Sequence, residues 1–180
     1  METYPLIPHP DFPPSLLSGI EARIVGRDDR WLRLRWRLFD ARAVVFPPFA
    51  GKGRATDLWK NTCFELFLRP EGGQAYVELN LSPSERWAAY DFVSWREGMA
   101  DRPMPREPEC TARVGQRMAI FDAAVPAAGL PVGPAHVGLS AVIEEEGGVI
   151  SYWSIAHPRG KPDFHDAACF AAELPAPGAP

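Results

Sequence analysis

Several common features are missing from this 180-residue sequence. It has no apolar run long enough to span a bilayer, and its first residues, METYPLIPHPDFPPS, show no basic segment followed by an apolar stretch, as a secretory signal would. Basic residues are not in excess, because the net charge is −4 and the isoelectric point is near 5.6. This balance argues against nucleic acid and against an anionic membrane as partners.

Cysteine is also scarce. Cys63, Cys110 and Cys169 are odd in number, widely spaced and not part of a CxxC pair, which indicates reduced thiols in a cytoplasmic protein. Cys63 has no histidine base nearby in the sequence, so no nucleophile is predicted. The Gly51–Gly53 stretch lacks the remaining residues of a phosphate loop. The sequence therefore predicts no catalytic residue, no resident metal and no cofactor.

Proline and glycine, by contrast, are abundant, with 20 and 15 residues spread along the chain. Turns at this frequency predict about ten short strands in an all-β protein, and no long amphipathic helix is evident. We expect one domain over residues 1–180. Its first 15 residues are predicted to form an irregular arm, and residues 175–180 a frayed tail. A last strand is predicted over Cys169 to Leu174.

Two stretches show the clearest strand patterns. In Trp31 to Phe39, leucines and Trp36 alternate with arginines, which is the period of a strand with one buried face. Trp59 to Pro83 contains two alternating runs around a glycine turn, which predicts a β-hairpin. The parity of the two runs places Glu65 opposite Glu78 or Asn80. Trp31, Trp36, Trp95 and Trp153 are expected in the core.

The polar face of this hairpin is the predicted binding site. Carboxylates and amides can pair with sugar hydroxyls, while aromatic rings can stack on sugar C–H faces. Arg35 is expected to form an ion pair with Glu65 or Glu78 if its strand is adjacent. Loop residues 40–58 are expected to form a lip over this face. The predicted ligand-binding residues are Trp59, Asn61, Glu65, Tyr76, Glu78, Asn80, Trp87 and Arg35.

Four segments taken together resemble a known family. They read LWKNTCFELFL at 58–68, YVELNLSPSERWAAYDF at 76–92, REGM at 96–99 and YWSIAHPRGKPDFHDAACF at 152–170. This set is similar to the bacterial DOMON-like proteins and, more distantly, to the family-nine carbohydrate-binding modules of xylanases. The resemblance implies an immunoglobulin-like antiparallel β-sandwich, whose concave face or nearby cleft takes sugars or haem in relatives.

The resulting hypothesis is a non-catalytic binding module for a saccharide or another small polar ligand. A protein-interaction or structural domain is the alternative. A glycoside hydrolase using Glu65 and Glu78 is a further alternative, since such enzymes use two acids. A haem-binding domain with Met99 or Met104 and a histidine as ligands is another. His157, Asp163 and His165 could bind a metal, but a structural role in fixing the loop is favoured.

Overall fold

The computed structural model describes residues 2–176, which form an all-β protein, as predicted. The strands are β1 (Glu2–Pro8), β2 (Gly19–Arg27), β3 (Trp31–Phe39), β4 (Gly53–Arg54), β5 (Cys63–Pro70), β6 (Tyr76–Leu81), β7 (Arg86–Phe92), β8 (Ala100–Asp101), β9 (Glu109–Val114), β10 (Met118–Pro126), β11 (Ala135–Glu145), β12 (Val149–Ser154) and β13 (Ala172–Leu174). Two of them, β1 and β4, lie in stretches that the sequence predicted to be irregular.

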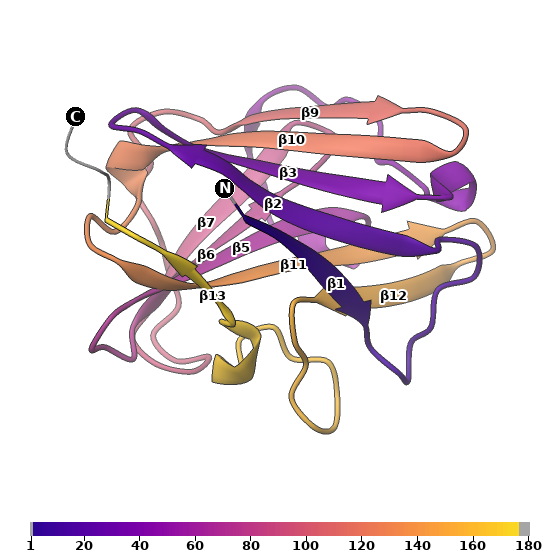
Figure 1. The fold of residues 1–180 in the computed structure, drawn as a ribbon. Helices are drawn as coiled ribbons and strands as arrows, with labels where there is room; N and C mark the ends of the chain where they lie inside the picture. The colour runs from indigo at the N-terminus through magenta and orange to yellow at the C-terminus, as the bar shows by residue number, and fades with distance from the viewer. Residues whose placement is uncertain (1, 177–180) are drawn as a thin grey trace.

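The strands form one curled mixed sheet that resembles half of a barrel (Figure 1). Its order is β4-β7-β6-β5-β11-β12-β1-β2-β3-β10-β9, with β13 and β8 added to β11 and β7. β4 runs parallel to β7, whereas the other pairs are antiparallel. β1 joins the two halves, because Glu2 to Leu6 pair with β2 and the next residues, Ile7 and Pro8, pair with β12.

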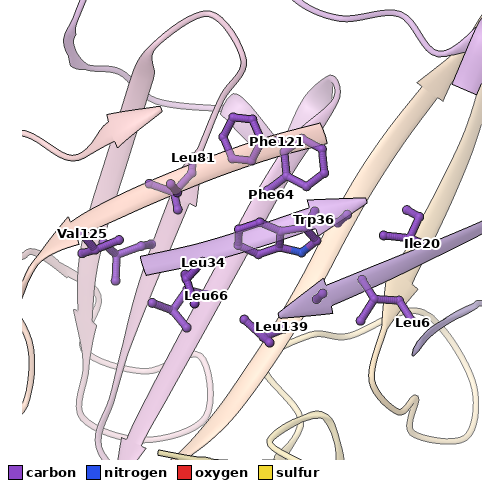
Figure 2. Close-up of a cluster of buried hydrophobic side chains, with 14 of the residues drawn as sticks. Leu6, Ile20, Leu34, Trp36, Phe64, Leu66, Leu81, Phe121, Val125 and Leu139 are labelled. Carbon is purple, nitrogen blue, oxygen red and sulfur yellow. The ribbon is translucent and has the colours of Figure 1, made fainter. Parts of the chain in front are cut away.

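The core lies between these two halves, which we call the β3 half (β1, β2, β3, β10 and β9) and the β6 half (β12, β11, β5, β6, β7 and β4). Figure 2 shows side chains from both halves gathered in one cluster. Phe64 of β5 stacks on Phe121 of β10 with ring centroids 4.2 Å apart, and Trp36 of β3 lies 5.4 Å from Phe64. All three side chains are fully buried, so the halves are held together by apolar burial.

The predicted alternation in β3 and in the central hairpin is confirmed. Leu32, Leu34, Trp36 and Leu38 are buried in the core, while the intervening arginines point away from it. In the hairpin, the core faces of β5 and β6 carry Phe64, Leu66, Leu68, Val77, Leu79 and Leu81. Because successive side chains alternate, Glu65, Glu78 and Asn80 all lie on the opposite, outer face of the β6 half.

The irregular arm predicted for residues 1–15 is wrong in its first part, where Glu2–Pro8 form β1. Pro5 and Pro8 favoured a loop, but β1 is the strand at which the sheet changes partners, so its ladder is already divided. The segment after β1 is held by Glu145, whose buried carboxylate accepts the backbone N–H groups of Ser15, Leu16 and Leu17 at 2.6–2.9 Å. Residues 177–180 of the predicted tail lie outside the described residues.

The last predicted strand is also shorter than expected. Ala167–Cys169 form a 3-10 turn, and only Ala172–Leu174 pair with β11. The side chain of Asp166 caps this turn by accepting the N–H of Ala168, which favours a turn over an extended strand. Helix within residues 2–176 consists of such short 3-10 turns, and none is long and apolar enough to cross a membrane.

Candidate functional site

A cleft of about 1110 Å³ opens on the outer face of the β6 half. Its floor is supplied by β5, β6, β7, β11 and β12, whose outward side chains alternate with the core residues. Its walls come from loops that are far apart in the sequence. The lining residues are Asp11, Phe12, Thr56, Asp57, Trp59, Glu65, Glu78, Asn80, Tyr90, Phe92, Arg96, Met99, Asp101, Val142, Tyr152, Lys161, Pro162, Phe164 and His165.

Polar side chains form the deepest part of this floor. Glu65 pairs across the strands with Asn80, one of the two registers predicted, and Phe67 pairs with Glu78. Glu65, Glu78 and Asn80 are only 3%, 7% and 2% exposed, so they are not the solvated outer face that hairpin patterning alone would suggest. Asn80 Nδ2 donates to Glu78 Oε1 at 2.8 Å, and Ser140 Oγ donates to Glu65 Oε2 at 3.4 Å.

Burial raises the pKa of both carboxyl groups. Desolvation raises the pKa of Glu78 to about 7, against the lowering effects of the Asn80 hydrogen bond and the Arg96 charge. The pKa of Glu65 is raised well above its ordinary value, first by burial and then by repulsion from Glu78. Both groups thus favour the protonated form, because their charges are buried and lie close to each other.

His165 lies beside this floor and is held by Tyr76. The hydroxyl of Tyr76 accepts the N–H of Arg96 at 3.1 Å and shares a hydrogen bond with Nδ1 of His165 at 2.7 Å. Nε2 of His165 faces Glu78 Oε2 at 3.6 Å. Burial, with the Arg96 charge, lowers the pKa of His165 to about 4, so the ring is neutral at physiological pH.

Asp163 fixes the loops on this side of the cleft. Its carboxylate accepts from the guanidinium of Arg96 at 2.7 Å, from the indole of Trp95 at 3.0 Å and from the N–H of His165 at 3.1 Å. Arg96 adopts a left-handed backbone conformation (φ 56°), a strained state that these contacts hold in place. The structural role predicted for Asp163 is thus confirmed, while Trp95, expected in the core, is 60% exposed.

Aromatic rings lie beside the acids and around them. Tyr90 and Phe92 extend from β7, and Tyr90 pairs directly with Glu78 across the strands. Phe12 meets Tyr152 edge to face with centroids 5.0 Å apart, which closes the far side. Trp59, 48% exposed, stands at the rim together with Thr56 and Asp57. The loop before β5 therefore forms the lip that the sequence predicted.

The structure gathers four of the eight predicted site residues, Trp59, Glu65, Glu78 and Asn80, around the cleft. Tyr76 lies behind it, where its ring stacks on Phe92 at 4.8 Å and its hydroxyl holds His165. Asn61 stays outside and donates to Glu144 at 3.1 Å. These two residues support or flank the site and do not line it.

The prediction was wrong for two site residues, Trp87 and Arg35, which lie away from the cleft. Trp87 is 5% exposed in the core, under the guanidinium of Arg54 at 4.5 Å, because odd residues of β7 face inward. The register of β6 with β7 would have identified Tyr90 and Phe92 instead, since Tyr90 pairs with Glu78. Arg35 lies on the β3 half and binds Asp122 on neighbouring β10 at 2.6 Å, far from Glu65 in the sheet order.

The residues considered for a metal site, His157, Asp163 and His165, do not form one in the described part of the chain. Within residues 2–176, no three His, Cys, Asp or Glu side chains are arranged to hold a metal ion. His157 Nε2 instead contacts the carbonyl of Ile7 at 2.8 Å. Met99 lines the cleft, but Met104 packs against the core. Burial raises the pKa of the Cys63 thiol well above its ordinary value, which makes it a poor nucleophile.

The protein is all-β, and its cleft has carboxylic acids on the floor with aromatic rings beside them. Solved structures share this fold. No protein-family model and no curated protein matches the chain. A protein of Bacteroides uniformis ATCC 8492 to which carbohydrate binding has been ascribed is 17% identical, with a TM-score of 0.64 over 94% of this chain and 84% of that one. A family-nine carbohydrate-binding module of Caldicellulosiruptor kristjanssonii, solved with glucose, is 11% identical, with a TM-score of 0.52 over 93% and 83%.

Carbohydrate binding is thus ascribed to one neighbour and seen with glucose in the other, and at such identities the likeness establishes the fold alone. The distant similarity to family-nine modules, predicted from the sequence, is confirmed at this level. The more specific resemblance to DOMON-like proteins stays a prediction.

Proposed function

We propose that the cleft on the β6 half binds a saccharide or a similarly small polar ligand without transforming it. The observation that carries this proposal is the arrangement of Tyr90 and Phe92 beside Glu78 and Asn80 in one recess. Sugars present apolar C–H faces and a ring of hydroxyls, so they need rings and acceptors at the same place. The glucose-bound module with the same fold supports the proposal.

The finer description of the fold belongs to the same proposal. We expect the curled sheet to be an immunoglobulin-like sandwich of the DOMON type, occupying the whole chain as one domain in the cytoplasm. An alignment of DOMON-like proteins in which the positions of Glu65 and Glu78 vary freely would argue against assigning the chain to this type.

Calorimetric titration with a panel of mono- and oligosaccharides tests the function. Tyr90→Ala and Glu78→Ala are each expected to weaken binding by roughly tenfold or more, because each removes one of the two kinds of contact. Arg35→Ala is the control that separates the two halves of the sheet, and it should leave the affinity unchanged. The proposal fails if no saccharide binds or if Tyr90→Ala binds as well as the parent.

A glycoside hydrolase is the second candidate, and one observation favours it. Glu78, with its pKa raised to about 7, has the property of a general acid, and Glu65 lies diagonally across the strands from it. Turnover of chromogenic glycosides that disappears in Glu65→Gln would establish this function in place of simple binding.

A further inference from the structure

The floor of the cleft has more hydrogen-bond acceptors than donors, although Ser140 donates to Glu65 at 3.4 Å and Asn80 to Glu78 at 2.8 Å. Glu65 and Glu78 present carboxylate oxygens, and Asn80 uses its amide N–H₂ on Glu78. The remaining amide oxygen, Asn80 Oδ1, is buried and has no hydrogen-bond partner in the described part of the chain. A buried acceptor that lacks a donor costs free energy until a donor arrives. The missing partner is therefore a group rich in N–H or O–H donors.

Charge points the same way. Arg96, the cation nearest the floor, is committed to Asp163 at 2.7 Å, and His165 beside Glu78 is neutral. No lysine or arginine within residues 2–176 forms an ion pair with Glu65 or Glu78. At the mouth, Asp57 pairs with Lys60 at 2.8 Å and Asp101 with Arg54 at 3.7 Å, so the exposed Asp11 and Lys161 roughly balance there. The two acids of the floor are therefore the charges that attract a cation into the recess.

We infer that the ligand of this cleft carries a protonated primary amine, and that it is an amino sugar whose ammonium group is bound by Glu65, Glu78 and Asn80. This inference rests on the proposed saccharide function and names the class of saccharide. An ammonium group has three N–H donors and no acceptor, which matches three acceptors facing one space. A neutral sugar hydroxyl offers one donor and would leave a carboxylate unbalanced.

The aromatic rings of Tyr90 and Phe92, beside the acids, suit the same ligand. Tyr90 stands directly across the strands from Glu78, so a cation held by that carboxylate lies close to the ring of Tyr90. Aromatic faces attract ammonium groups, and this attraction grows when water is excluded. An ammonium group between Glu65 and Glu78 would stabilise their charged forms and so act against the burial that raises the pKa of both.

Titration calorimetry with glucosamine, N-acetylglucosamine and glucose near neutral pH tests this inference. The three sugars share a ring, and only glucosamine carries the cation. Charge-assisted hydrogen bonds predict that glucosamine binds roughly tenfold to a hundredfold more tightly than either neutral sugar. If glucosamine binds no better than N-acetylglucosamine, the inference is overturned while the saccharide function stands. If none of the sugars binds, both fall.

Two isosteric variants locate the preference. In Glu65→Gln and Glu78→Gln, the ratio of the affinities for glucosamine and glucose should fall towards one, since the carboxylate is lost while its shape remains. Glu109→Gln, at an exposed position on β9, is the matched control and should keep the parent ratio. Circular dichroism establishes that each variant is folded. A ratio unchanged in both floor variants would place the amine elsewhere and overturn the inference.

Discussion

The raised pKa of Glu78 makes the stability of the fold depend on pH. The residue is 7% exposed, its carboxylate faces Asn80, His165 and, diagonally, Glu65, and the charge of Arg96 acts to lower its pKa. Its pKa of about 7 lies above the ordinary value of 4.5, so between these pH values the folded protein binds more protons than the unfolded chain. The stability that Glu78 contributes is therefore complete below pH 4.5 and is lost as the pH rises through 7.

This linkage predicts how the thermal stability of the free protein changes with pH. His165 opposes it only between its folded pKa of about 4 and its ordinary value of 6.5, where rising pH stabilises the fold. Above pH 6.5 the thermal midpoint of the free protein should therefore fall, and Glu65 should extend the fall. Glu78→Gln should flatten this fall and stabilise the protein by roughly 1–3 kcal/mol on the alkaline side. Melting curves that stay parallel for parent and variant would refute the linkage, and Glu109→Gln supplies the baseline.

At the residue scale, sequence patterning predicts which side chains share a face but not what covers that face. Glu65, Glu78 and Asn80 could be grouped from alternation alone, and the structure places all three at the cleft. Tyr90 could also have been found by extending the register of β6 to β7. His165 and Phe12 could not, because loops far apart in sequence bring them to the site.

At the scale of elements, the two loops around Asp163 form one wall of the cleft. The turn after β7 carries Trp95 and Arg96, the segment after β12 carries His165, and all three donate to Asp163. Burial acts to raise the pKa of Asp163, but the hydrogen bonds from Arg96, Trp95 and His165 and the charge of Arg96 together lower it. The carboxylate thus ties together two segments that no strand pairing connects.

Asp163→Asn is therefore expected to loosen this wall more than it weakens the fold. The change removes the charge that holds Arg96 and should cost about 1–3 kcal/mol of global stability. Amide hydrogen exchange should accelerate in residues 93–99 and 157–166, while β5 and β6 remain protected. Asp29→Asn, at an exposed turn, is the control. Unchanged exchange in both loops would show that Asp163 does not anchor them.

Strands could be predicted from the sequence where one face is buried and the other is exposed to solvent. The strand β3 alternates leucine with arginine, and its arginines pair with Asp28, Asp122 and Glu21 on the outer surface. β1 was not predictable, because its prolines indicate a loop unless the strand is known to divide between two partners. The prediction that the last strand begins at Cys169 was wrong, because the Asp166 cap favours a turn there.

At the scale of the whole molecule, the two halves of the sheet depend on one aromatic contact region. Phe64→Ala should destabilise the protein by roughly 3–5 kcal/mol, because it removes the ring that stacks on Phe121 and leaves a cavity. Phe49→Ala, at a side chain that is 73% exposed, should change stability by less than about 0.5 kcal/mol. Urea unfolding measures both, and similar midpoints for the two variants would contradict this description of the core.

The position of a bound sugar tests the central claim most directly. We expect a crystal structure of the protein with glucosamine or glucose to show the ring against Tyr90, with its polar groups on Glu78 and Asn80. A sugar bound on the β3 half near Arg35, or a cleft that stays empty in crystals saturated with both sugars, would contradict the account.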